Sequence, residues 1–165
     1  MKYMNTARGY TLIELVIVIL IMSLLVGVGV AGYRDFSRRQ DVQNAGRALI
    51  ADLRIAQGAA NSGEKPAGCN ALNGVVFDVT SATSYTLCYA CNVNYTNQRC
   101  SELGFTMKQV TPQNGSTLSV TGTHPILFRV LGRGTNLSAV TTVTIGSGSG
   151  AASRSVTVNP GGRIE

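Results

Sequence analysis

The chain has 165 residues and a formal net charge of +6, and only 13% of its residues are charged. This length fits one domain with an anchor segment rather than several domains. The 19 glycines, with frequent Thr, Ser and Val and few charges, favour a β-rich domain outside the cytoplasm over a cytosolic enzyme. The positive charge is compatible with an anionic partner such as DNA, but by itself it does not indicate one.

An apolar run near the N-terminus predicts a membrane helix. Between Leu15 and Tyr33 there is no charged residue, and Ser23 is the strongly polar side chain of the run. About nineteen residues at 1.5 Å per residue approach the thickness of a hydrocarbon core of about 30 Å. Glu14 stands at the start of the run. Because an ionisable side chain costs at least about 2.5 kcal/mol inside a bilayer, Glu14 is a candidate functional residue.

The residues before the run predict a cleavage site of an unusual kind. An ordinary secretory signal has a shorter apolar region that is followed by a small-residue cleavage site, whereas here Gly9 precedes the run. Cleavage after Gly9 would remove a basic leader, residues 1–9, and leave Tyr10 as a free N-terminus. The new ammonium of one chain could neutralise the Glu14 carboxylate of a neighbour, because isolated charges are costly in a low dielectric. This geometry predicts lateral assembly of many such helices.

The helix is expected to continue beyond the membrane, from about Tyr10 to Asn61. Residues 10–33 would form its transmembrane or filament-core part, and residues 34–62 an amphipathic continuation that packs on the domain. Apolar residues at spacings of three and four form a stripe in this second part. The stripe consists of Val42, Ala45, Leu49, Leu53, Ala56 and Ala60. Most charged residues, Asp52 among them, are expected on other faces of the helix.

Residues 63–165 are predicted to form a β-rich domain. Seven short segments are rich in Val, Ile, Thr or Tyr and are bounded by turn residues. They are 74–80, 84–90, 105–110, 117–120, 126–131, 139–145 and 154–159. The glycine- and serine-rich residues 146–152 would link the last two strands as a hairpin tip. The predicted fold class is α+β, with a long N-terminal helix packed on a C-terminal antiparallel sheet domain.

Four cysteines lie in this domain, at Cys69, Cys88, Cys91 and Cys100. Two disulfides are the natural interpretation for an exported domain, and four cysteines allow three connectivities. We expect the pairs Cys69–Cys88 and Cys91–Cys100. The two-residue spacing between Cys88 and Cys91 also leaves a metal site or free, redox-active thiols as alternatives.

No catalytic constellation is found in the sequence, and neither a cofactor nor a metal site is expected. His124 is the single histidine and precedes Pro125, where a turn or surface position is expected. A histidine-based hydrolase would need a positioned nucleophile and an orienting partner. The carboxylates of Asp78 and Glu102 are expected to be solvated rather than paired for acid–base work. The sequence therefore predicts a protein that is not an enzyme.

The segment Arg8-Gly9-Tyr10-Thr11-Leu12-Ile13-Glu14-Leu15 resembles the class III signal of type IV pilins and type II secretion pseudopilins. Phe is usual in that family where Tyr10 stands here. The resemblance implies that a prepilin peptidase cuts between Gly9 and Tyr10 and methylates the Tyr10 amine. It also implies that Glu14 pairs with the amine of an adjacent subunit.

The C-terminal half resembles the GspH/FimT group of minor pseudopilins and minor pilins. The resemblance rests on Pro125–Phe128, on the strands around Val143 and Val156, and on the Gly162-Arg163 pair near the end. It implies a minor subunit that primes, caps or modulates a type II secretion pseudopilus or a type IV pilus. The implied partners are other pilins, prepilin peptidase and an inner-membrane assembly platform. The implied location is the inner membrane as a single-pass protein with an extracytoplasmic domain, and then the filament.

A filament-tip subunit that binds DNA for uptake is the alternative. Four arginines in the C-terminal part could contact phosphates. They are Arg129, Arg133, Arg154 and Arg163. Some FimT-like proteins end in Gly-Arg-x-Arg, but here the second arginine is replaced by Glu165, which disfavours this function. An anchored β-domain that never assembles is a further alternative.

Overall fold

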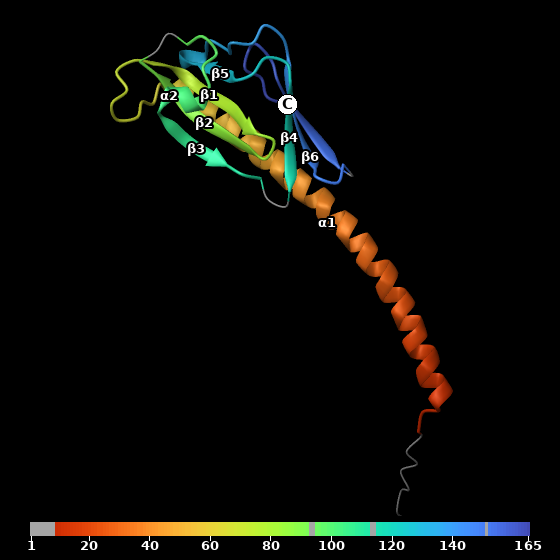
Figure 1. Cartoon of the computed structure of the whole chain (residues 1–165). Helices are drawn as coiled ribbons and strands as arrows, with labels where there is room; N and C mark the ends of the chain where they lie inside the picture. The colour runs from red at the N-terminus through yellow and green to blue at the C-terminus, as the bar shows by residue number, and fades with distance from the viewer. Residues whose placement is uncertain (1–8, 93–94, 113–114, 151) are drawn as a thin grey trace, which may run out of the picture. The chain divides into compact units, whose positions relative to one another are not determined.

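The structure is a computed structural model, and it describes residues 9–92, 95–112, 115–150 and 152–165. Residues up to Ser37 and residues from Arg38 onward form two compact units. The described residues form one long helix followed by seven strands, most of which are labelled in Figure 1. The predicted α+β class is confirmed.

Helix α1 spans Leu12–Ser62, within two residues of the predicted ends. In its second half the predicted apolar stripe is confirmed, because Val42, Leu49, Leu53 and the alanines at 56 and 60 are buried. Ala45 is partly buried beside them. The spacing of three and four places these side chains on one face, and this face is covered by the strands.

The strands form two antiparallel sheets. The first contains β1 (Leu72–Ser81), β2 (Ser84–Cys91), β3 (Thr106–Val110) and β5 (Ile126–Arg129), in the order β3-β2-β1-β5. The second contains β4 (Ser116–Thr121), β6 (Thr141–Ser147) and β7 (Ser153–Val158), in the order β4-β6-β7. All seven predicted strands are present. Two short elements were not predicted, namely the helix α2 (Cys100–Leu103) and the 3-10 turn η1 (Val130–Gly132).

One hydrophobic core joins the helix to both sheets. Leu49 and Leu53 of α1 contribute to it with Phe77 of β1, Phe128 of β5 and Val156 of β7. The last residues of the chain add an edge to the second sheet, because the backbones of Thr157 and Glu165 exchange two hydrogen bonds, of 2.8 and 3.0 Å. The domain is therefore closed by its own C-terminus.

Gly162 ties this terminus to the helix. Its carbonyl accepts a 2.8 Å hydrogen bond from the Gln57 side chain of α1. Its φ of +89° lies in the region that side chains rarely adopt, and a Cβ would crowd the same Gln57 amide. A glycine is required here for both reasons.

The two disulfides join Cys69 to Cys91 and Cys88 to Cys100. The expected pairing, Cys69–Cys88 with Cys91–Cys100, is therefore wrong. Side chains alternate along a strand, so Cys88 and Cys91 lie on opposite faces of β2. Cys88 faces the small cluster that α2 covers, which contains Cys100. Cys91 lies opposite Leu72 at the start of β1, which brings Cys69 close to it.

Asp52 is buried in the helix–sheet interface, and its expected position on an outer face is wrong. Its side chain accepts a 2.8 Å hydrogen bond from the Tyr85 hydroxyl and forms a 2.7 Å ion pair with Lys108. The exposed fraction of Asp52 is only 3%. Burial and the neighbouring Asp52 raise the pKa of Tyr85, so the phenol stays protonated and donates.

Asp78 is also buried, although we expected a solvated carboxylate. It accepts hydrogen bonds from the Arg99 guanidinium at 2.9 Å and from the Cys100 backbone N–H at 3.0 Å. His124 Nε2 lies 3.0 Å from Asp78 Oδ1, the oxygen that also accepts the Arg99 bond, so the expectation that His124 is a turn or surface residue holds only in part. Burial by itself would raise the pKa of Asp78, but these hydrogen bonds outweigh burial and lower its pKa to about 2. Glu102 is exposed, as expected.

Replacing Tyr85 or Tyr95 by Phe removes one buried hydroxyl group in each case, and the two variants can be compared directly. The Tyr95 hydroxyl is buried and has no hydrogen-bond partner among the described residues. We expect Tyr85→Phe to lower the free energy of unfolding by about 1–3 kcal/mol, because Asp52 loses a buried donor. Tyr95→Phe should change it by less than about 0.5 kcal/mol or raise it, because no bond is lost. Urea unfolding of both full-length variants in the same detergent checks this, and an equal loss would contradict the geometry.

The Asp78 cluster predicts a loss of stability in acid. Because its folded pKa of about 2 lies below the ordinary 3.8, its contribution is present above pH 3.8 and is lost as the pH falls toward 2. Asp78→Asn should lower stability at pH 7 by about 2 kcal/mol. The difference between variant and wild type should shrink as the pH approaches 2. Thermal unfolding from pH 7 to pH 2 measures it, and a constant difference would argue against the assignment.

Candidate processing and assembly site

The first turn of α1 is closed by a capping motif that the sequence analysis missed. Thr11 precedes the helix, and its hydroxyl accepts a hydrogen bond from the Glu14 backbone N–H at 3.4 Å. The Leu15 N–H bonds to the Thr11 carbonyl at 3.3 Å and starts the helical ladder. Thr followed three residues later by Glu is the sequence signature of a capping box, so the signal was available.

Glu14 is exposed in this first turn. A carboxylate at this position is favoured by the positive end of the helix dipole. Tyr10, Glu14, Leu15 and Val18 line one shallow hollow of about 300 Å³. Glu14 and Tyr10 thus lie on the same side of the helix start. The predicted leader, residues 1–9, lies outside the described residues except for Gly9.

An uncovered apolar surface follows Glu14. Large apolar side chains from Leu12 to Val30 are between 46% and 83% exposed. This stretch belongs to a helix that is long and apolar enough to cross a membrane. A Cβ built at Gly27 or Gly32 would meet no atom of this chain within 4 Å. These glycines therefore leave room where another helix can approach closely.

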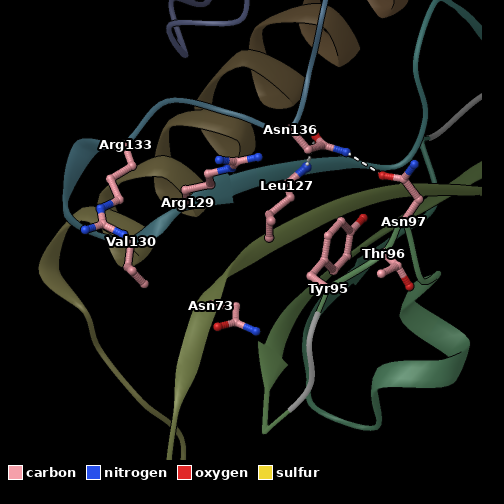
Figure 2. A pocket seen from close by; sticks show the side chains of 9 residues that line it. All are labelled: Asn73, Tyr95, Thr96, Asn97, Leu127, Arg129, Val130, Arg133 and Asn136. Atoms are coloured by element: carbon pink, nitrogen blue, oxygen red, sulfur yellow. Dashed lines mark hydrogen bonds between the residues drawn. The ribbon is translucent and has the colours of Figure 1, made fainter.

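The four candidate DNA-contacting arginines do not form one cluster. Arg154 lies over Gly46 of α1 and donates a 2.6 Å hydrogen bond to Gln43. Arg163 forms a 2.6 Å ion pair with Glu165. Arg129 and Arg133, by contrast, line a common hollow in the domain (Figure 2). A continuous row of cations of the kind that follows a DNA backbone is not formed by these four residues.

Residues 4–30 match the family model described as the prokaryotic N-terminal methylation motif. The matched segment contains Gly9, Tyr10, the Thr11 cap and Glu14, and it extends over most of the exposed apolar surface.

One similar solved structure is the minor pseudopilin EpsH from the type 2 secretion system of Vibrio cholerae. Its sequence is 13% identical to this chain, and the TM-score is 0.49. The match covers 76% of this chain and 94% of EpsH. A likeness at this level does not by itself transfer a function. No curated protein is significantly similar to the chain.

Proposed function

We propose that the chain is a minor pilin or pseudopilin subunit of the GspH/FimT kind. It would be processed by prepilin peptidase and assembled into a type II secretion pseudopilus or a type IV pilus. The observation that carries the proposal is the methylation motif at residues 4–30, which overlaps a helix whose apolar surface is left exposed by the described residues. Exposed apolar surface of this extent indicates a membrane or a partner.

In the proposed division of the chain, residues 1–9 are the leader and residues 10–33 cross the inner membrane and later enter the filament core. Residues 34–62 continue the helix, and residues 63–165 form the extracytoplasmic domain. The sequence and the stripe of α1 support these boundaries. The role is structural rather than enzymatic, and the partners are other pilins, the peptidase and the membrane assembly platform.

The proposed assembly contact is electrostatic. After cleavage between Gly9 and Tyr10, the methylated amine of Tyr10 on one subunit pairs with Glu14 on the next. Two supports are the exposure of Glu14 and its place beside Tyr10 at the helix start. A carboxylate among lipid or packed apolar helices is costly until a cation neutralises it, so the pair fixes the axial position of one helix against another.

The DNA-uptake alternative is not favoured. Arg154 and Arg163 have partners within the domain, and the acidic Glu165 stands where some FimT-like proteins carry a second arginine. Nucleic-acid binding is therefore not part of the proposed function.

Processing is the first test. Intact-mass analysis of the full chain, co-expressed with a prepilin peptidase, should give a product that lacks residues 1–9 and carries one methyl group on Tyr10. A control pilin processed in parallel shows that the enzyme is active. An uncut chain beside a processed control would overturn the proposal and leave an anchored domain.

Assembly is tested by Glu14→Gln, which keeps the shape of the side chain and removes its charge. Membrane insertion should be unchanged, because a neutral side chain is easier to insert. Incorporation into sheared filaments should fall about tenfold or more, which corresponds to the loss of roughly 1.4 kcal/mol. The matched control is Glu64→Gln, an exposed carboxylate of the domain, which should assemble normally. Normal incorporation of Glu14→Gln would rule out the proposed contact.

A further inference from the structure

A polar hollow in the domain has no role in the proposed assembly. Its volume is about 620 Å³, which lies in the range of small-molecule sites. Its lining comes from the start of β1, the segment before α2, the end of β5 and the turn after it. The lining residues are Asn73, Tyr95, Thr96, Asn97, Leu127, Arg129, Val130, Arg133 and Asn136. None of these is acidic, although the hollow contains two arginines.

Both arginines are held by one tight turn. The Arg129 N–H donates to the Gly134 carbonyl at 2.9 Å, and this bond closes the loop that contains Arg133. Leu131 and Gly132 have φ of +57° and +69°, which reverses the chain within three residues. Figure 2 shows both side chains on the side of the hollow away from Thr96 and Asn97, with their guanidinium groups pointing in different directions. The turn thus fixes where both arginines enter the hollow.

Among the described residues, no partner is found for the guanidinium groups of Arg129 and Arg133. In the described part of the chain, neither Arg129 nor Arg133 takes part in an ion pair. Arg154 and Arg163 of the same sheet region are occupied by Gln43 and Glu165. An oxyanion that enters the hollow can accept bidentate hydrogen bonds from such an unpaired guanidinium group.

Neutral polar groups face the arginines across the hollow (Figure 2). Thr96 Oγ1 accepts a hydrogen bond from Gln98 at 3.2 Å, so its own O–H remains able to donate to a ligand. Asn97 Oδ1 accepts a 2.9 Å bond from Asn136, and its amide N–H groups remain as donors. The Tyr95 ring forms a wall beside them. Burial, with smaller effects of Asp78 and Glu102, raises the pKa of Tyr95 and keeps its phenol neutral. This side suits hydroxyl groups or a second oxygen of the ligand.

The segment that carries these neutral groups is fastened at both ends. Cys91 before it is bonded to Cys69, and Cys100 after it is bonded to Cys88. The Asn136 side chain, which also bonds Leu127 N–H at 2.8 Å, joins the segment to the strand that ends in Arg129. A site built on fastened segments loses less entropy when it binds a ligand.

We propose that this hollow binds a small hydroxylated oxyanion of about the size of a sugar acid or a sugar phosphate, with Arg129 and Arg133 as its anion-binding pair. This inference is independent of the proposed assembly function. The shared chemistry is the oxyanion, and a carboxylate or a phosphate can supply it. A nucleic-acid strand fits less well, because two cations set in one hollow do not follow a polyphosphate backbone.

The test is a calorimetric titration of the full chain in detergent micelles with glucuronate, glucose 6-phosphate, inorganic phosphate and glucose. One or more of the three anions should saturate the protein below about 10 mM, and glucose should bind at least about tenfold more weakly. Saturation by inorganic phosphate with glucose 6-phosphate identifies a phosphate site, and saturation by glucuronate alone identifies a carboxylate site. Both results support the proposal.

The variant R129A/R133A should weaken binding of the preferred anion at least about tenfold. The variant R129K/R133K keeps both charges but lacks the planar guanidinium groups, so an intermediate loss of anion affinity is expected. This variant replaces the alanine variant in the test if the latter folds poorly. The matched control R47A/R54A removes two exposed arginines of α1 that do not line the hollow and should change affinity less than about twofold. An equal loss in this control, equal binding of glucose, or no saturation by any of the three anions would each overturn the proposal.

Discussion

The burial of one face of α1 is the constraint on which the domain depends. The sheets have four and three strands, and the apolar face of each sheet must be buried against another layer of structure. Leu49 and Leu53 supply that surface to strands of both sheets at once. The buried Asp52 adds direction to this contact, because its two oxygens bind Tyr85 of β2 and Lys108 of β3. Apolar burial gives the contact its strength, and the polar pair fixes its register.

The first part of α1, up to Ser37, has a different distribution of apolar residues around the helix. There the apolar residues lie on all sides rather than on one face, and they remain exposed. A helix that is apolar all around must be covered by lipid or by other helices. A Cβ built at Gly27 or Gly32 would meet no atom of the chain beyond the local helix backbone, and the charged Glu14 stands at the capped end. The second half of α1 thus has the apolar pattern of a helix that packs on its own domain. The first half has the apolar pattern of a helix that packs against lipid or other helices.

Periodicity explains what could be predicted from the sequence. The stripe from Val42 to Ala60 follows from apolar residues that recur about every 3.6 positions, and the seven strands follow from apolar residues that recur every second position. Both patterns can be read in the sequence because each places the apolar side chains on the buried face of its element. The disulfides could not be assigned in the same way. Their pairing depends on which face of β2 each cysteine occupies and on the register between Leu72 and Cys91, and both are set by tertiary structure. Asp52 and Asp78 were misplaced for a related reason, since a charge is expected outside until its buried partners are known.

The hollow shows how these long-range features combine. Arg129 reaches its place because β5 pairs closely with β1, where Gly74 lies opposite Arg129 and a Cβ would collide with the Phe128 carbonyl. The disulfides enclose the segment that faces it, and Cys69 itself belongs to the loop before β1. The Cys69–Cys91 bond joins the loop before β1 to the end of β2. The Cys88–Cys100 bond joins β2 to α2 inside a second buried cluster, which also contains Val76 and Leu127. The two cross-links thus connect the polar segment around Tyr95 to the first sheet, and a fixed arrangement of polar groups is what recognition of a ligand requires.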